Sequence, residues 1–457
     1  MQRIDWNAIL DRYARRPAAV LSANASNYGA PGPVIDFQAP LAHTLIPENK
    51  KAKSAWKNMF LDGRPPINVG VTSGGDLFGG TAVSFTDVLG DRRINLYAAS
   101  MSQYRSFGAA LINQSKRFTW AVQGYWDDTF YYGQLGGVFY DPVYSPFIDR
   151  DLAIATRSSR GATGFGIYPL NRYQRLEVYG GFGYVSESYN DPVLQEIANQ
   201  YQQEVYGQSL YRKGFYVPLG VAFVQETTIF REFGPLSGNT MRVAFEYAPK
   251  VDSIAWQSVD VDVRKYFKLG SSGTLALRAK GFRSWGGTPD FQYFGGNSEM
   301  RGYDYLEFVG QNAVFGNVEL RFPLIEAMAT PIGVLGGVRG VFFFNMGGAW
   351  WDNSGYQFAT TKDEVVQPPI GITFDPETGL PIYEFGPPQL ITGFRLVDGR
   401  ASYGIGLQTM ALGFPIHFDW SWRTMFNKAW EDAYWSLSGG SSAFRKARFQ
   451  FWIGYDF

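Results

Sequence analysis

The sequence predicts an all-β fold: a transmembrane antiparallel β-barrel of about 16 strands, with a short N-terminal periplasmic segment. Three features support this prediction: the alternation of the last nine residues, the absence of any long apolar run, and the sorting of connections by length. In the terminal segment every second side chain is large and apolar: Phe449, Phe451, Ile453, Tyr455 and Phe457. Only Trp452 interrupts the otherwise polar or small second face. A period of two indicates a strand, and an apolar face that runs to a terminal aromatic is typical of a last strand facing lipid.

The composition fits a barrel that spans a membrane with strands. Aromatic residues make up 17% of the chain and there are 53 glycines, yet the mean hydropathy is -0.18. This mixture arises when each strand directs only half of its side chains to lipid. No stretch approaches the roughly 18 apolar residues of a membrane helix. Lys and Arg together number 41, as do Asp and Glu, so no nucleic-acid partner is predicted. The absence of cysteine excludes disulfides and thiolate chemistry.

The central and C-terminal regions divide into alternating segments of strand length. In one of them Val259, Val261 and Val263 oppose Asp260 and Asp262. Charges of both signs on one face and aromatic residues near the ends of the other favour a water-filled lumen inside an aromatic-girdled barrel over a soluble sandwich. We expect strands near residues 67–74, 78–88, 92–101, 106–112, 118–127, 152–169, 173–187, 214–228, 238–249, 252–267, 273–284, 312–323, 336–346, 401–411, 414–424 and 447–457.

The connections between these strands alternate in length. The long ones are 128–151, 188–213, 285–311, 347–400 and 425–446, and most of the others are short, although 229–237 and 324–335 are longer than expected. Short periplasmic turns and long external loops are the usual asymmetry of such barrels. Apolar residues in 188–213 fall at helical spacing, which predicts a loop helix over the mouth.

The segment Gly295-Gly-Asn-Ser-Glu-Met-Arg-Gly-Tyr303 lies in one of the long loops, followed by strand candidates over 316–324 and 342–350. Together with the aromatic last strand, this order closely resembles the BamA/TamA family of the bacterial surface antigen superfamily. The resemblance covers about residues 67–457. It implies an outer-membrane barrel that takes part in protein insertion into, or translocation across, that membrane.

The resemblance also implies a lock inside the lumen. In that family the arginine of the Arg-Gly-aromatic motif, here Arg301, contacts acidic residues on the following two strands. The first partner would be Glu319, which the alternation independently places inward because Val318 and Leu320 face lipid. The second is normally an aspartate, but this chain has Asn345, so we expect a lock with one ion pair fewer. The full set of expected lock residues is Gly295, Gly296, Arg301, Gly302, Tyr303, Glu319 and Asn345.

A second implied site is a C-terminal signal that the assembly machinery recognises. Its residues would be Phe449, Phe451, Ile453, Gly454, Tyr455 and Phe457. The same terminal strand should pair with Ile67–Gly74 to close the barrel. That first strand contains two glycines and short side chains, so we expect few hydrogen bonds at this seam.

Residues 1–65 differ from the barrel region, 66–457. They are too short for a typical periplasmic POTRA domain, and no apolar segment of a signal peptide follows Met1. Val34–Leu41 resembles the end of a larger periplasmic module, such as the TolB-like β-propeller that precedes some of these barrels. We therefore expect the chain to be a fragment whose first part is periplasmic.

Enzymatic function is not predicted. The sequence lacks the usual nucleophile, metalloprotease and phosphate-binding motifs, and its two histidines are His43 and His417. His417 and Asp419 share a face and could form a hydrolytic pair, but a polar lumen lining is the favoured interpretation. No cofactor and no metal site are expected. The expected partners are outer-membrane lipid, client outer-membrane proteins and periplasmic accessory proteins. Two alternatives stay open, a solute channel and a membrane anchor for a periplasmic propeller.

Overall fold

The computed structural model describes residues 59–62, 67–71, 77–101, 104–132, 154–189, 191–206, 211–231, 234–270, 272–296, 299–304, 307–330, 333–352, 354–374, 381–411 and 414–453. All of them belong to one compact unit, Met59–Phe457. The N-terminal residues 1–58, which include Val34–Leu41, lie outside the described part of the chain.

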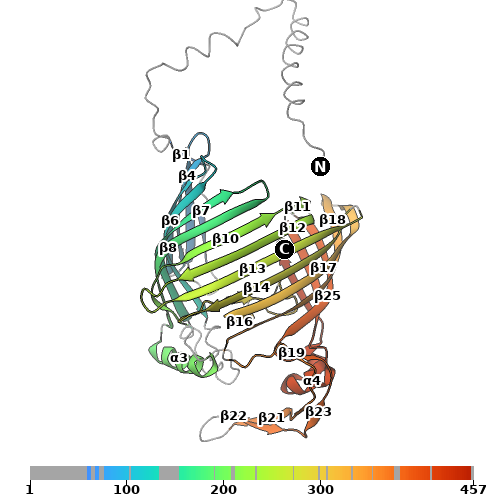
Figure 1. The fold of residues 1–457 in the computed structure, drawn as a ribbon. Helices are drawn as coiled ribbons and strands as arrows, with labels where there is room; N and C mark the ends of the chain where they lie inside the picture. The colour runs from blue at the N-terminus through green and yellow to red at the C-terminus, as the bar shows by residue number, and fades with distance from the viewer. Residues whose placement is uncertain are drawn as a thin grey trace, which may run out of the picture. The chain divides into compact units, whose positions relative to one another are not determined.

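The unit is built from antiparallel strands, most of them long, which form the curved wall in Figure 1. These are β1 (Phe60–Leu61), β2 (Ile67–Val71), β3 (Leu77–Thr86), β4 (Arg92–Met101), β5 (Tyr104–Asn113), β6 (Thr119–Tyr132), β7 (Ile154–Pro169), β8 (Gln174–Tyr189), β9 (Lys213–Tyr216), β10 (Leu219–Glu226), β11 (Ile229–Arg231), β12 (Gly234–Ala248), β13 (Trp256–Leu269), β14 (Gly273–Trp285), β17 (Asn312–Thr330), β18 (Gly333–Trp350), β25 (Arg400–Ala411), β26 (Phe414–Thr424) and β27 (Arg448–Ile453).

Each strand pairs with its neighbours in chain order. β1 and β2 both pair with β3, β9 and β10 both pair with β8, and β10 and β11 both pair with β12. Counted in this way, the described ladder contains sixteen successive strands, as the sequence predicts. They are β1–β2, β3, β4, β5, β6, β7, β8, β9–β11, β12, β13, β14, β17, β18, β25, β26 and β27. Within the described ranges, the ladder ends at β2 on one side and β27 on the other, and no register joins these two. The weak seam stays a prediction, because residues 72–76 and 454–457 are outside those ranges.

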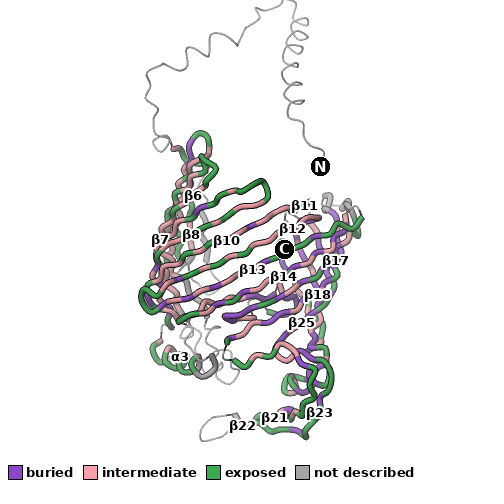
Figure 2. Tube along the Cα trace, in the orientation of Figure 1, coloured by how far each residue is buried: buried purple, intermediate pink, exposed green. Residues whose placement is uncertain are grey.

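The two faces of the wall have opposite chemistry. Large apolar side chains point outward and are exposed, among them Val243, Val318, Phe342, Ile405 and Phe451. The alternate positions point into the barrel and are polar yet buried, above all on β13 to β26, where Figure 2 shows buried positions concentrated. A soluble protein has the reverse arrangement. A barrel in lipid requires apolar side chains on its outer surface and can hold polar side chains in its interior.

Connections follow the predicted asymmetry. The long ones lie at one end of the strands, and Figure 1 shows α3 (Pro192–Tyr206), α4 (Lys428–Tyr434) and β19 (Ala359–Thr360) to β23 (Gln389–Ile391) beyond that end. The helix predicted over the mouth is α3. The connections expected over 229–237 and 324–335 are shorter than the sequence suggests. β11 extends to Arg231 and β12 begins at Gly234, while β17 extends to Thr330 and β18 begins at Gly333. No helix in the described part of the chain is long and apolar enough to cross a membrane.

The external connections after β18 and β26 pack against each other. They contain β20 (Glu364–Val366), β21 (Pro369–Phe374), β22 (Pro381–Phe385), β24 (Arg395–Leu396), η4 (Ser436–Ser438) and α5 (Gly440–Phe444). A shared apolar cluster that includes Leu396, Met425, Trp430 and Phe444 joins them. The C-terminal wall is therefore braced outside the membrane as well as inside the lumen.

Candidate functional site

One external connection turns back into the barrel. After β14, the chain forms a hairpin of β15 (Gln292–Phe294) and β16 (Phe308–Gly310), and between them lies the segment 295–304, which we call the lock loop. Phe294 stacks on Phe308 and on Phe315 of β17, with ring centroids 4.9 and 4.8 Å apart. Met300 and Tyr303 pack into the same buried cluster. Apolar packing thus fixes the base of the loop on the inner wall.

Glycines allow the sharp turn of the lock loop. Gly295, Gly296 and Gly302 have φ angles of 138°, 70° and 89°, in the region that residues with a side chain avoid. The carbonyl of Gly296 accepts hydrogen bonds from the backbone N–H groups of Glu299 and Met300, at 3.0 and 3.2 Å. The turn therefore presents the next residue, Arg301, to the centre of the lumen wall.

Arg301 binds two carboxylates. Its Nη1 contacts Oε1 of Glu319 on β17, and its Nε lies 3.1 Å from Oδ2 of Asp419 on β26. The guanidinium also lies over the ring of Phe343, 4.6 Å from the centroid. All three charged side chains are buried, with at most 1% of each exposed. A dry site makes such charge-assisted bonds strong, and it also makes the loss of one partner costly.

The charges in this cluster balance. Arg321, also fully buried, donates from Nε to Oε2 of Glu319 at 2.8 Å. Two guanidinium groups therefore face two carboxylates, which satisfies the requirement that buried charges be paired. Asp419 also accepts a hydrogen bond from Nε1 of Trp452 on β27, at 2.8 Å. The cluster thus extends across the wall from β17 to the terminal strand.

Asn345 does not take the place of the missing aspartate. It points inward, as the alternation predicts, and is fully buried. Its Oδ1 accepts a bond from Asn317, and its Nδ2 donates to Oγ of Ser402, which in turn donates to the backbone carbonyl of Arg301. The expectation of one ion pair fewer is wrong, because Asp419, two strands beyond β18, supplies the second carboxylate.

The terminal strand binds the lock loop directly. Gln450 accepts from the backbone N–H of Gly302 at 2.9 Å and donates to the carbonyl of Tyr303 at 3.2 Å. Arg448 donates to the carbonyl of Gly302 at 3.0 Å and binds Asp304. On the opposite side, the hydroxyl of Tyr303 donates to the carbonyl of Ala401 on β25. The tip of the loop therefore contacts β17, β25, β26 and β27 through polar groups, and it contacts β18 through the ring of Phe343.

Sequence reasoning missed part of this site. It did not assign Asp419, Gln450, Arg448 or Trp452 to the lock. The alternation of the strands places all four side chains on the inward face, and Trp452 is the one large aromatic residue on that face of the terminal strand. What looked like a candidate hydrolytic pair is part of the lock: His417 is 1% exposed and stacks on Trp452, with centroids 3.6 Å apart.

The predicted C-terminal signal is described only in part. Phe449, Phe451 and Ile453 are outward and 55–56% exposed, as expected for side chains in contact with lipid. Gly454, Tyr455 and Phe457 lie outside the described residues.

Among the residues with described positions, no group of three or more His, Cys, Asp or Glu side chains is arranged to bind a metal.

Comparison with known proteins places this geometry in a family. A family model described as the Omp85 superfamily domain matches residues 139–457. Among solved structures, a BamA from Haemophilus ducreyi lacking POTRA domains 1–3 is similar, with a TM-score of 0.53 and 14% identity over 86% of this chain and 69% of that one. CdiB from Acinetobacter baumannii has a TM-score of 0.41 and 14% identity, over 86% of this chain and 59% of its own. No match was found among curated protein sequences.

Proposed function

The chain belongs to the Omp85 superfamily, and on this premise we propose that its lock loop maintains the C-terminal wall of an outer-membrane barrel that inserts or translocates proteins. The protein is an outer-membrane β-barrel, and it takes part in the insertion of proteins into that membrane or in their translocation across it. The observation that carries the proposal is the path of the lock loop, which binds β17, β25 and β26 through buried polar contacts and β27 through a partly buried one.

The lock acts on the strand beside the seam. β27 is six residues long and pairs with β26 over 416–421 and 448–453. Over these described residues, β27 forms backbone hydrogen bonds with one neighbour, β26. The bonds from Gln450 and Arg448 to the loop add to these, so the position of β27 depends on whether the loop is seated. We propose that this dependence sets how readily a client strand gains access to the seam.

The remaining assignments belong to the same proposal. The partners are client outer-membrane proteins and periplasmic accessory proteins. Residues 1–65 are proposed as an N-terminal periplasmic segment or the end of a larger upstream module, and the terminal aromatic residues through Phe457 as the assembly signal of the chain. The proposal includes no hydrolytic role for His417 and Asp419, because Asp419 binds Arg301 and Trp452 and His417 stacks on Trp452.

A reconstitution experiment tests the proposed function. Liposomes that contain the purified protein are mixed with a urea-unfolded eight-stranded outer-membrane barrel, and the folded fraction of this client is followed by heat-modifiable mobility. We expect folding several-fold faster than with empty liposomes, and a loss of most of this gain in Arg301→Ala. Arg172→Ala is the matched control, because Arg172 is exposed in a short turn and packs on Tyr173. Equal client folding with and without the protein would contradict the proposal, and a steady single-channel conductance would then favour the channel alternative.

A further inference from the structure

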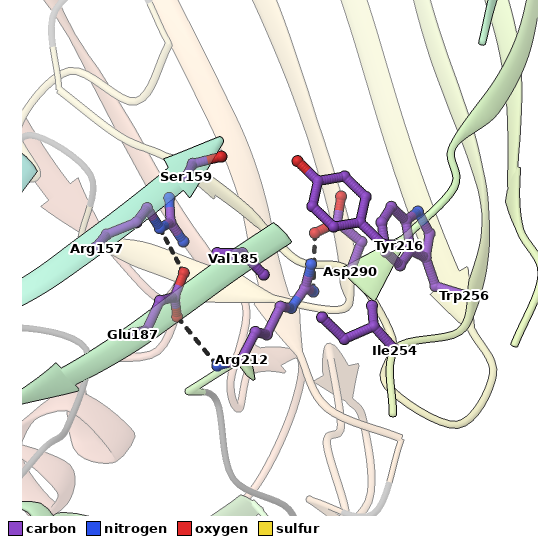
Figure 3. Close-up of a pocket in the computed structure, with 9 residues that line it drawn as sticks. All are labelled: Arg157, Ser159, Val185, Glu187, Arg212, Tyr216, Ile254, Trp256 and Asp290. Carbon is purple, nitrogen blue, oxygen red and sulfur yellow. Dashed lines mark hydrogen bonds and ion pairs between the residues drawn. The ribbon is translucent and has the colours of Figure 1, made fainter. Parts of the chain in front are cut away.

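Arg212 lies where two external loops meet. It follows the α3 connection and immediately precedes β9. Its backbone extends the β8–β9 ladder, because the N–H of Glu187 donates to the carbonyl of Arg212 at 2.9 Å. Its side chain leaves this ladder and crosses to the segment ahead of the lock loop, as Figure 3 shows for Arg212 between Glu187 and Asp290.

The side chain of Arg212 is almost fully engaged. Its Nη2 lies 2.7 Å from the carbonyl of Pro289 and 2.9 Å from Oδ1 of Asp290. The guanidinium also lies 5.4 Å from the ring centroid of Trp256 and 5.0 Å from that of Phe291. Only 14% of the side chain is exposed. The cation is thus held by a carbonyl and a carboxylate and lies close to two aromatic rings, which fixes its position at the meeting point of the two loops.

The segment that receives Arg212 is itself fixed to the barrel. The N–H of Thr288 donates to the carbonyl of Ala255 at 2.9 Å, and the N–H of Asp290 donates to Oγ of Ser284 at 2.7 Å. Two residues later the chain enters β15 and then the lock loop. A displacement of this segment is therefore transmitted directly to the residues that lead to Arg301.

Arg212 also lines two cavities at the external end of the barrel. One, of about 240 Å³, is lined by Ser159, Tyr216 and Trp256. The other, of about 380 Å³, is lined by Gln203 of α3 and by Phe291. Arg212 and Ile254 line both cavities. Truncation of Arg212 would therefore enlarge both cavities and make their lining more accessible.

We propose that Arg212 is a positioning residue for the lock loop: it joins the end of the α3 connection to the segment that enters the lock loop, so that the two segments open together. This inference rests on the role of the lock loop in the proposed function. Its test measures hydrogen exchange and thiol labelling instead of client folding. The role of Arg212 and the proposed function can therefore be refuted separately.

The first measurement is hydrogen exchange of the whole protein in liposomes. In Arg212→Ala we expect exchange to rise about tenfold in α3 and also in the β15–β16 hairpin, since loss of a charge-assisted bond shifts a local opening equilibrium by about that factor. Asp290→Asn should produce a similar change with less disturbance of packing, and the double variant should be little different from either single one. Arg172→Ala should leave both segments unchanged. A rise in α3 alone would overturn the proposal.

The second measurement uses the absence of cysteine from the chain. Ser159→Cys places a single thiol in the smaller cavity, and its reaction with a membrane-impermeant maleimide is followed on intact cells. We expect slow labelling in an otherwise unchanged protein and labelling about tenfold faster with Arg212→Ala. The charge exchange Arg212→Asp with Asp290→Arg should restore slow labelling, which a merely structural role would not predict. Fast labelling with Arg212 present, or no change on its truncation, would overturn the proposal.

Discussion

Removal of the lock arginine should unbalance a buried charge cluster. Arg301→Ala leaves Glu319 paired with Arg321, but it removes the arginine partner of Asp419, which keeps the hydrogen bond from Trp452. A wet lumen would screen the unpaired carboxylate, and on that basis the cost would be small. The cluster is instead fully buried. Breaking a buried pair from one side costs about 3–5 kcal/mol of the free energy of unfolding, and we expect a loss in that range.

The charge argument makes a sharper prediction for a second variant. Asp419→Asn removes the carboxylate that Arg301→Ala leaves unpaired, while the amide oxygen can still accept the bond from Trp452. The double variant should therefore be at least as stable as Arg301→Ala alone. Arg301→Lys should lose less than Arg301→Ala, about 1–3 kcal/mol, because a lysine keeps the charge but cannot form a fork to both acids.

Urea unfolding of the purified barrel in detergent measures these differences. The folded fraction at each urea concentration is read from heat-modifiable mobility, and Arg172→Ala provides the control for loss of an exposed arginine. The free energy of unfolding should fall with Arg301→Ala and recover or stay level when Asp419→Asn is added. Additive losses in the double variant would refute the reasoning, since they would mean that the two side chains stabilise the barrel independently.

Three further outcomes are expected. Asn345→Asp should lower stability by about 1–3 kcal/mol in the same urea assay, because it buries a third carboxylate where two are already matched; unchanged stability would show that the cluster has spare positive charge. Gly302→Ala should cost a similar amount, since its φ is 89° and a Cβ there would lie 2.9 Å from Oγ of Ser421, whereas Gly281→Ala, with open space around it, should be neutral. Deletion of Phe457 should reduce the amount of heat-modifiable barrel in membranes; normal abundance of folded protein would argue against a C-terminal signal.

The alternation of the sequence was sufficient to place most of the fold. Side chains alternate between the two faces of a strand whatever the partner strand is. Inward positions such as Glu319 and Asn345 could therefore be assigned before any pairing was known, and both are buried inside the barrel. Strand ends were less certain. β17 and β18 extend to Thr330 and Gly333, because pairing across the hairpin, and not local composition, keeps those residues in the sheet.

Periodicity is enough to assign side chains to the lumen face and to identify the loop whose glycines let it turn inward. Which of the inward groups meet depends on how the strands and the loop are arranged in space. Arg301 and Asp419 are 118 positions apart in the chain, and their contact depends on the path of the lock loop and on the stagger of strands that are not neighbours. A local period of two contains no information on either quantity. For that reason Asp419 could be predicted to face inward, but its choice over Asn345 as the partner of Arg301 could not.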